Sequence, residues 1–128
     1  MNWCYQSYVD TLIGKVYNKS ENWKSTLLLI FQFFDDNHLY FEQAVKVQGE
    51  NSFCNFLYNY SYDFYKHIYL DNTNSKLLTD EARVALEFTC IGSVHIVKEW
   101  LVNGRKESVK DISLWTFQLI PVMFRKYL

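Results

Sequence analysis

The stretch HIVKEWLVNG, residues 95–104, has the pattern of a helix followed by a stop. Its apolar residues recur at intervals of three and four, as they do along one face of a helix. The Asn103-Gly104 pair then ends the pattern, because glycine readily adopts the left-handed backbone conformation that follows many helices. Upstream, Thr79 is a typical N-cap residue. We therefore predict a long helix between Thr79 and Asn103.

The rest of the chain carries similar patterns, so we predict an all-α fold of five to six helices. One proline and four glycines leave few interruptions to helical structure. We expect Asp35-Asp36-Asn37 to offer caps for a short helix, and Pro121 either to kink the last helix or to start its last turn. The predicted helices cover residues 3–17, a segment capped by Ser20, residues 38–47, residues 51–70, residues 79–103, and a last segment from Ser108 to the C-terminus.

The last two predicted helices are apolar on two faces rather than one. A helix that is apolar nearly all round must be buried all round, and two adjacent terminal helices of a small domain cannot both be central. We therefore predict a homodimer in which these helices and their copies form an antiparallel four-helix bundle. On the last helix we expect the stripe of Ile112, Trp115/Thr116, Leu119 and Met123 to face the chain's own core, but periodicity alone leaves open which of the two stripes faces inward. The predicted dimer interface consists of Phe88, Ile96, Trp100, Leu114, Phe117, Pro121 and Phe124.

Length and composition limit the classes of protein to which this chain can belong. The 128 residues fit a single domain, 1–128, and the net charge of -1 gives no electrostatic footprint for DNA. The N-terminus lacks a secretory signal pattern, and the longest apolar run is too short to cross a bilayer. The three cysteines, Cys4, Cys54 and Cys90, form no Cys-x-x-Cys pair, so we expect reduced thiols in a cytoplasmic protein with no membrane partner.

No motif of catalysis or of cofactor binding is found in the sequence. It contains no glycine-rich phosphate loop and no nucleophile elbow, and its three histidines lack metal-ligand spacing. We therefore expect a protein that is not an enzyme, with no catalytic residues, no metal site and no cofactor.

Three stretches resemble the ligand-binding domains of TetR-type bacterial transcription regulators. They are FFDDNHLYFEQAV (residues 33–45), GENSFCNFLYNY (49–60) and IVKEWLVNGRKESVKDISLWTFQL (96–119), and the closest likeness is to the dihydroxyacetone kinase regulator-like branch. The resemblance covers most of the chain but rests on helix-packing patterns. TetR-type regulators begin with a helix-turn-helix, for which this sequence has no counterpart. The resemblance therefore implies an effector-binding and dimerisation domain that reaches DNA only through a missing N-terminal helix-turn-helix.

The aromatic side chains leave two interpretations of the interior open. They form either a solid core or the lining of an apolar pocket with a few polar groups, and the resemblance favours a pocket for an unknown small-molecule effector. A solid core would instead indicate a helical protein-interaction module with no small-molecule ligand. The predicted ligand-binding residues are Phe34, His38, Phe56, Tyr60, Phe64, Phe88 and His95.

Overall fold

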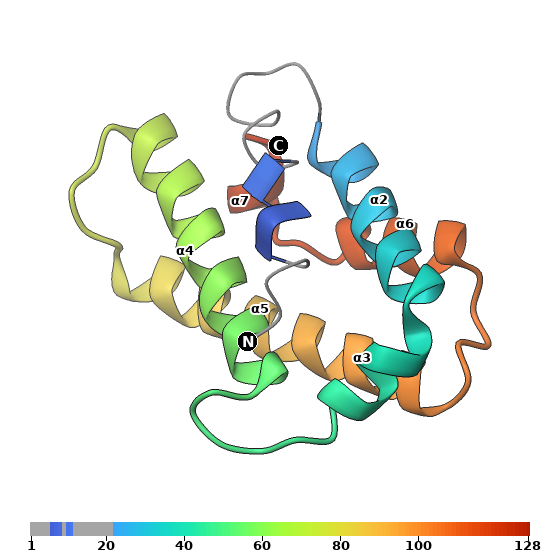
Figure 1. The fold of residues 1–128 in the computed structure, drawn as a ribbon. Coiled ribbons are helices and arrows are strands. Elements are labelled where there is room, and N and C mark those ends of the chain that lie inside the picture. The colour runs from blue at the N-terminus through green and yellow to red at the C-terminus, as the bar shows by residue number, and fades with distance from the viewer. Residues whose placement is uncertain (1–5, 9, 12–21) are drawn as a thin grey trace.

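The described part of the chain, residues 6–8, 10–11 and 22–128 of a computed structural model, is built from α-helices. The all-α prediction is therefore confirmed, and the described residues form no strand. None of the described helices combines the length and the hydrophobicity that a bilayer crossing requires. The helices, shown in Figure 1, are α2 (Trp23–Asp36), α3 (His38–Ala44), α4 (Phe53–Thr73), α5 (Asp80–Val102), α6 (Val109–Gln118) and α7 (Val122–Arg125).

Side-chain caps fix where the longer helices begin. Thr79 accepts a 3.1 Å hydrogen bond from the backbone N–H of the third residue of α5, and Ser108 accepts one of 3.0 Å at the start of α6. Ser52 caps α4 in the same way, at 3.1 Å. These three predicted helix starts are confirmed. Asn22 caps α2, whereas Ser20 and most of the first predicted helix lie outside the described residues.

The C-terminal ends of the helices match the predictions only in part. Gly104 follows α5 with a φ of 85°, as the Asn-Gly stop predicted. The prediction that the helix starting at Ser108 continues to the C-terminus is wrong, because α6 ends at Gln118. Pro121 starts the separate last turn, α7, which was one of its two expected roles. A proline lacks the backbone N–H that would continue the α6 ladder, but it fits the first turn of a new helix.

Asp35 and Asp36 lie in the last turn of α2, so the prediction that they cap the next helix is wrong for these two residues. Asn37, the third candidate, is the N-cap residue of α3, although its side chain makes no capping hydrogen bond. Carboxylates at a helix C-terminus oppose the helix dipole and need compensation. Arg105 supplies it through an ion pair of 2.7 Å between its Nη1 and Asp35 Oδ1. Arg105 itself adopts a positive φ of 54° directly after Gly104. This pair joins the end of α2 to the turn between α5 and α6.

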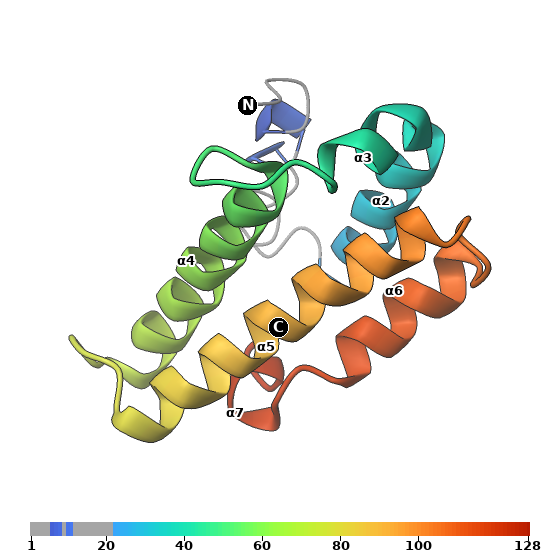
Figure 2. The ribbon, with the colours of Figure 1, turned by 90° about the horizontal axis from the view of Figure 1, so that it is seen from below.

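The helices pack in two main pairs, and the remaining short helices close the ends. α6 lies along α2, and α5 lies along α4. α3 packs across α5 near the end of α2, and α7 packs on α4. Figure 2 shows α5 and α6 running in opposite directions on one side of the molecule. The two C-terminal helices thus belong to different pairs, although a short turn joins them.

Aromatic rings hold the pairs together. Phe41 of α3 lies with its ring centroid 4.9 Å from Phe34 of α2 and 5.1 Å from Phe53 of α4. Phe31 of α2 meets Trp100 of α5 edge to face, at 5.4 Å between centroids. Such ring pairs stabilise a core beyond the burial of their area alone. The short helix α3 is therefore fixed by its one fully buried aromatic side chain.

We predict that Phe41→Ala lowers the free energy of unfolding by about 3–5 kcal/mol, because it leaves a cavity among the rings. The Phe41 side chain is 0% exposed. The matched control is Leu39→Ala on the same helix, whose side chain is 74% exposed, and it should change stability by less than about 0.5 kcal/mol. Urea denaturation of the three proteins measures both changes. Equal effects of the two substitutions would contradict the packing described for α3.

Candidate functional site

An inner cavity of about 50 Å³ lies where α2, α4, α5 and α6 meet. Three of the predicted ligand-binding residues, Phe34, Tyr60 and Phe64, line it. The structure therefore brings these three together around one space. The other lining residues are Trp23, Leu27, Ile30, Phe31, Leu57, Ser61, Tyr65, Ser93, Val97 and Thr116.

A buried hydrogen bond crosses the wall of the inner cavity. The Trp23 indole N–H of α2 donates to the Tyr65 hydroxyl of α4 at 3.0 Å. Burial raises the pKa of the Tyr65 phenol well above its usual range, because the phenolate would lose its solvation. Tyr65 is therefore neutral in the folded protein, and it keeps its own proton for donation while it accepts from Trp23. Sequence reasoning did not single out this pair.

The other predicted ligand-binding residues lie away from the lining of the inner cavity. Phe56 stands one turn from Tyr60, with 5.5 Å between the ring centroids. His38 lies on α3, where its Nδ1 is 3.1 Å from a Glu42 carboxylate oxygen. Phe88 and His95 lie on the exposed side of α5. The structure thus divides the predicted set between the interior and the surface.

A second candidate site is the outward face of α5 and α6, which carries large apolar side chains. Phe88 of α5 is 81% exposed, and Leu119, directly after α6, is 71% exposed. Trp115 of α6 is 48% exposed. Single exposed apolar residues are ordinary, but several gathered on adjacent elements mark an interaction surface. The exposed apolar residues of α5, of α6 and of the position directly after α6 are Val84, Phe88, Ile91, Val102, Trp115 and Leu119.

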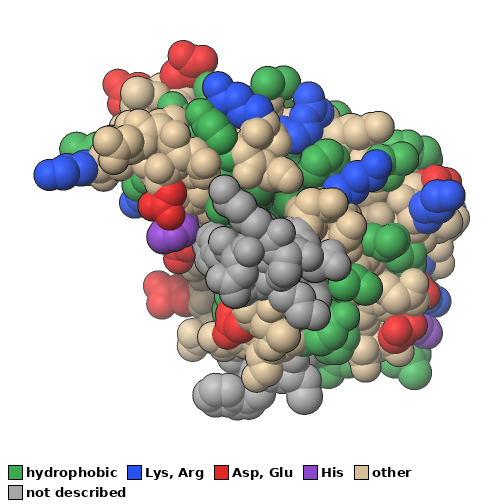
Figure 3. Space-filling model, turned by 90° about the horizontal axis from the view of Figure 1, so that it is seen from above, with side chains coloured by type: hydrophobic (Ala, Val, Ile, Leu, Met, Phe, Trp, Pro, Cys, Tyr) green, Lys and Arg blue, Asp and Glu red, His purple; other side chains and the backbone are tan. Residues whose placement is uncertain are grey.

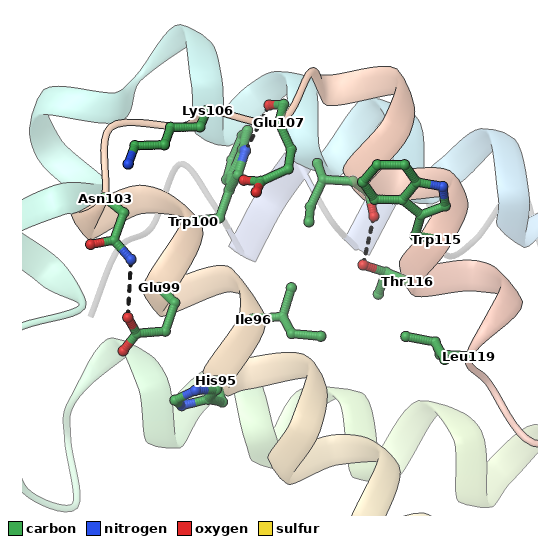
Figure 4. A pocket seen from close by; sticks show the side chains of 11 residues that line it. His95, Ile96, Glu99, Trp100, Asn103, Lys106, Glu107, Trp115, Thr116 and Leu119 are labelled. Carbon is green, nitrogen blue, oxygen red and sulfur yellow. Dashed lines mark hydrogen bonds between the residues drawn. The ribbon is translucent and has the colours of Figure 1, made fainter.

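The same face is hollowed between its two helices. A large groove of about 510 Å³ lies between the C-terminal half of α5 and α6 (Figure 4). One end of this groove is apolar, with Ile96, Trp115 and Leu119, and the other end is polar. A small hollow of about 190 Å³ continues it toward the N-terminal half of α5. The polar end of the large groove contains Glu99, Asn103, Lys106 and Glu107.

The predicted dimer-interface residues divide between this face and the core. Phe88 is exposed, and Ile96 lines both the large groove and the small hollow. Trp100 is buried against Phe31, and Phe124 is buried against Tyr69. The predicted Leu114, Phe117 and Pro121 are half-buried.

The stripe of α6 that faces the chain's own core matches the expected one in part: Ile112 and Thr116 belong to it, but Ser113 takes the place of Leu119. Leu119 is exposed, whereas Ile112, Ser113 and Thr116 are buried toward α2. The two hydroxyl groups are satisfied locally, since Ser113 donates to the Lys110 carbonyl and Thr116 donates to the Ile112 carbonyl. Apolar periodicity does not indicate Ser113 as a buried residue, and the small size of its side chain was the one signal in the sequence that it could pack against a neighbouring helix.

The charged groups of the described residues are spread over the surface rather than gathered into a metal site. Within the described residues, no three His, Cys, Asp or Glu side chains lie close enough together to hold a metal ion. Over the face in Figure 3, acidic and basic side chains are interspersed with hydrophobic ones. This mixed surface agrees with the net charge of -1.

Comparison with known proteins gives one family match. The C-terminal family model of the TetR type, described as "Transcriptional regulator C-terminal region", matches residues 21–121. No curated protein and no solved structure matches the chain significantly.

We predict that Trp23 and Tyr65 are energetically coupled. Tyr65→Phe should lower the free energy of unfolding by about 1–3 kcal/mol, because it leaves the Trp23 N–H buried without an acceptor. Trp23→Phe removes the donor, so adding Tyr65→Phe to it should cost at least about 1 kcal/mol less than adding it to the wild type. Thermal or urea unfolding of the four proteins gives this coupling energy. Tyr40→Phe at an exposed position is the control, and purely additive costs for the Trp23–Tyr65 cycle would rule out the bond.

Proposed function

This chain belongs to the TetR C-terminal family of transcriptional regulator domains; on that premise we propose that it is a regulatory domain that dimerises through α5 and α6 and responds to a small-molecule effector. The observation that carries the proposal is the exposed apolar face of these two helices. As a regulator, the domain binds its effector rather than converting it.

Dimerisation follows from what this face exposes. Two helices from each copy give a four-helix bundle, in which the exposed side chains of α5 and α6 leave water. Burial of apolar area is worth about 25 cal/mol per Å², and a stable interface usually buries at least ~1,000 Å² in total. Phe88, Ile91 and Leu119 contribute large side chains to it.

The effector would bind in the inner cavity, among Phe34, Tyr60 and Phe64. A link from this cavity to the start of the chain supports a regulatory role, because the Tyr60 hydroxyl donates to the Asp10 carboxylate. Tyr8 also stacks on Phe33 of α2, with 4.7 Å between the ring centroids. A ligand that moves Tyr60 would therefore move residues ahead of α2, and with them the spacing of DNA-reading segments joined there.

The volume of the inner cavity favours a second candidate for the input signal. A drug-sized ligand needs on the order of 300 Å³ or more, whereas this cavity measures about 50 Å³. Binding an effector therefore requires α2, α4 and α5 to move apart. A helical domain with a closed core would instead take its signal from a partner protein, so the second candidate is a protein-interaction module.

We predict that the purified chain is a homodimer and that Ile91→Glu makes it monomeric. Ile91 is exposed on α5, so its substitution spares the core but places a charge in a desolvated interface. The matched control is Val47→Glu, at a position that is exposed outside this face. Light scattering gives the mass of each protein, and circular dichroism verifies that it is folded. A dimeric Ile91→Glu protein would exclude this part of α5 from the interface.

We predict that indole, as a probe of small aromatic ligands, raises the melting temperature of the wild-type chain. Ligands that bind only the folded state stabilise it in proportion to the logarithm of their concentration. Ser61→Leu, which fills the inner cavity with a larger side chain, should abolish the shift. Differential scanning fluorimetry measures both proteins. If indole and a wider set of small aromatic compounds leave the wild type unshifted, the partner-protein candidate is favoured.

A further inference from the structure

The exposed face of α5 and α6 has a raised part and a hollowed part next to each other. Val84, Phe88 and Ile91 lie at helical spacing along the N-terminal half of α5 and form an exposed apolar ridge. The large groove lies beyond them, along the C-terminal half of the same helix. A face that carries both a ridge and a matching groove is self-complementary, as a symmetric dimer interface requires.

The groove exists because α5 and α6 pack mainly on other helices. α6 lies against α2 and α5 lies against α4, so the space between α5 and α6 is filled incompletely. Small residues occupy this junction on both sides. Gly92 and Ser93 of α5 and Thr116 of α6 line the small hollow. A Cβ atom added at Gly92 would meet nothing within 4 Å. Another helix can therefore come closest to α5 at Gly92.

We propose that α5 crosses α5 of a second copy in antiparallel orientation at Gly92, and that Phe88 of each copy seats between Ile96, Trp115 and Leu119 of the other. The two-fold symmetry of the dimer connects the position of Phe88 with the crossing point at Gly92. If Phe88 contacts Ile96 of the second copy, then Ile96 contacts Phe88 of that copy. The two α5 helices then run in opposite directions, and the two-fold axis passes midway between these residues, at Gly92.

The charges on the face agree with this register. In the antiparallel arrangement, Arg83 of one copy comes beside the polar end of the large groove of the other, near Glu99 and Glu107. Within the single chain Arg83 pairs with Glu87 at 2.7 Å, and both side chains are well exposed, so exchanging this partner costs little. Phe88 thus meets the apolar end of the groove, and Arg83 comes near the polar end, where two acidic residues, Glu99 and Glu107, lie with Lys106.

The inference rests on the proposed dimer, and a complementation experiment tests it separately. Phe88→Lys alone and Leu119→Glu alone should each weaken dimerisation at least about tenfold, because each spoils two symmetry-related contacts. Mixed together, the two variants should form a heterodimer, in which one contact becomes a lysine–glutamate pair and the other stays wild type. Native mass spectrometry distinguishes the heterodimer by its mass. The control mixture combines Phe88→Lys with Leu39→Glu, an exposed position on α3, and should give no rescue.

A disulfide tests the position of the axis. Gly92→Cys should form a covalent dimer on mild oxidation, because a residue on the two-fold axis faces its own copy within disulfide reach. Leu119→Cys is the matched control and should form less, since Leu119 faces Phe88 of the other copy. Oxidation of the wild-type chain measures how much covalent dimer the native cysteines form by themselves.

The outcomes separate this inference from the proposed function. A wild-type chain that stays monomeric contradicts the proposed dimer and this inference together. A wild-type dimer that Phe88→Lys leaves unchanged overturns the seat of Phe88 but keeps the dimer. A Gly92→Cys protein that cross-links no better than Leu119→Cys overturns the crossing point. Rescue by the mixed variants together with the Gly92 cross-link supports the arrangement.

Discussion

The Trp23 indole and the Tyr65 phenol meet in the interior, where a 3.0 Å hydrogen bond joins α2 to α4. Phe64 stacks on the same indole, with 4.2 Å between the ring centroids. Both polar groups are buried, so each needs the other as its partner, and this need fixes how α2 and α4 approach. α6 follows α2, and α5 follows α4. The arrangement of the two C-terminal helices therefore depends on a contact that neither of them makes.

This dependence explains the open junction between α5 and α6. Each of these helices gives its buried stripe to a different neighbour, and the short turn between them brings their outward sides together. Ile112, Ser113 and Thr116 face α2, which leaves Trp115 and Leu119 on the outside. Thr116 borders the inner cavity, the small hollow and the large groove. One threonine therefore stands between the interior and the proposed dimer face, so a change on one side of it bears on the other.

The features that the sequence predicted well, such as the helix starts, depend on local chemistry alone. Ser52, Thr79 and Ser108 satisfy backbone N–H groups of the next turn, a contact that needs no knowledge of the fold. The orientation of α6 was harder, because it depends on the size of Ser113 and Thr116 rather than on their hydrophobicity. Phe88, Phe34 and His38 are all plausible pocket residues by type, yet they lie on different helices at different depths. Which aromatic side chains share the inner cavity depends on how α2, α4, α5 and α6 come together.

The turn that joins α5 to α6 is held in place by a contact with α2. Arg105 holds a left-handed backbone conformation, which is unfavourable for a residue with a side chain, and its ion pair with Asp35 offsets that cost. Neither side chain of this pair is fully buried. The 2.7 Å between their charged atoms is much shorter than the Debye length of about 8 Å at physiological ionic strength, so dissolved ions screen the pair only in part. The path of the chain from α5 to α6 therefore stays anchored to the end of α2 at physiological ionic strength, beside the polar end of the large groove.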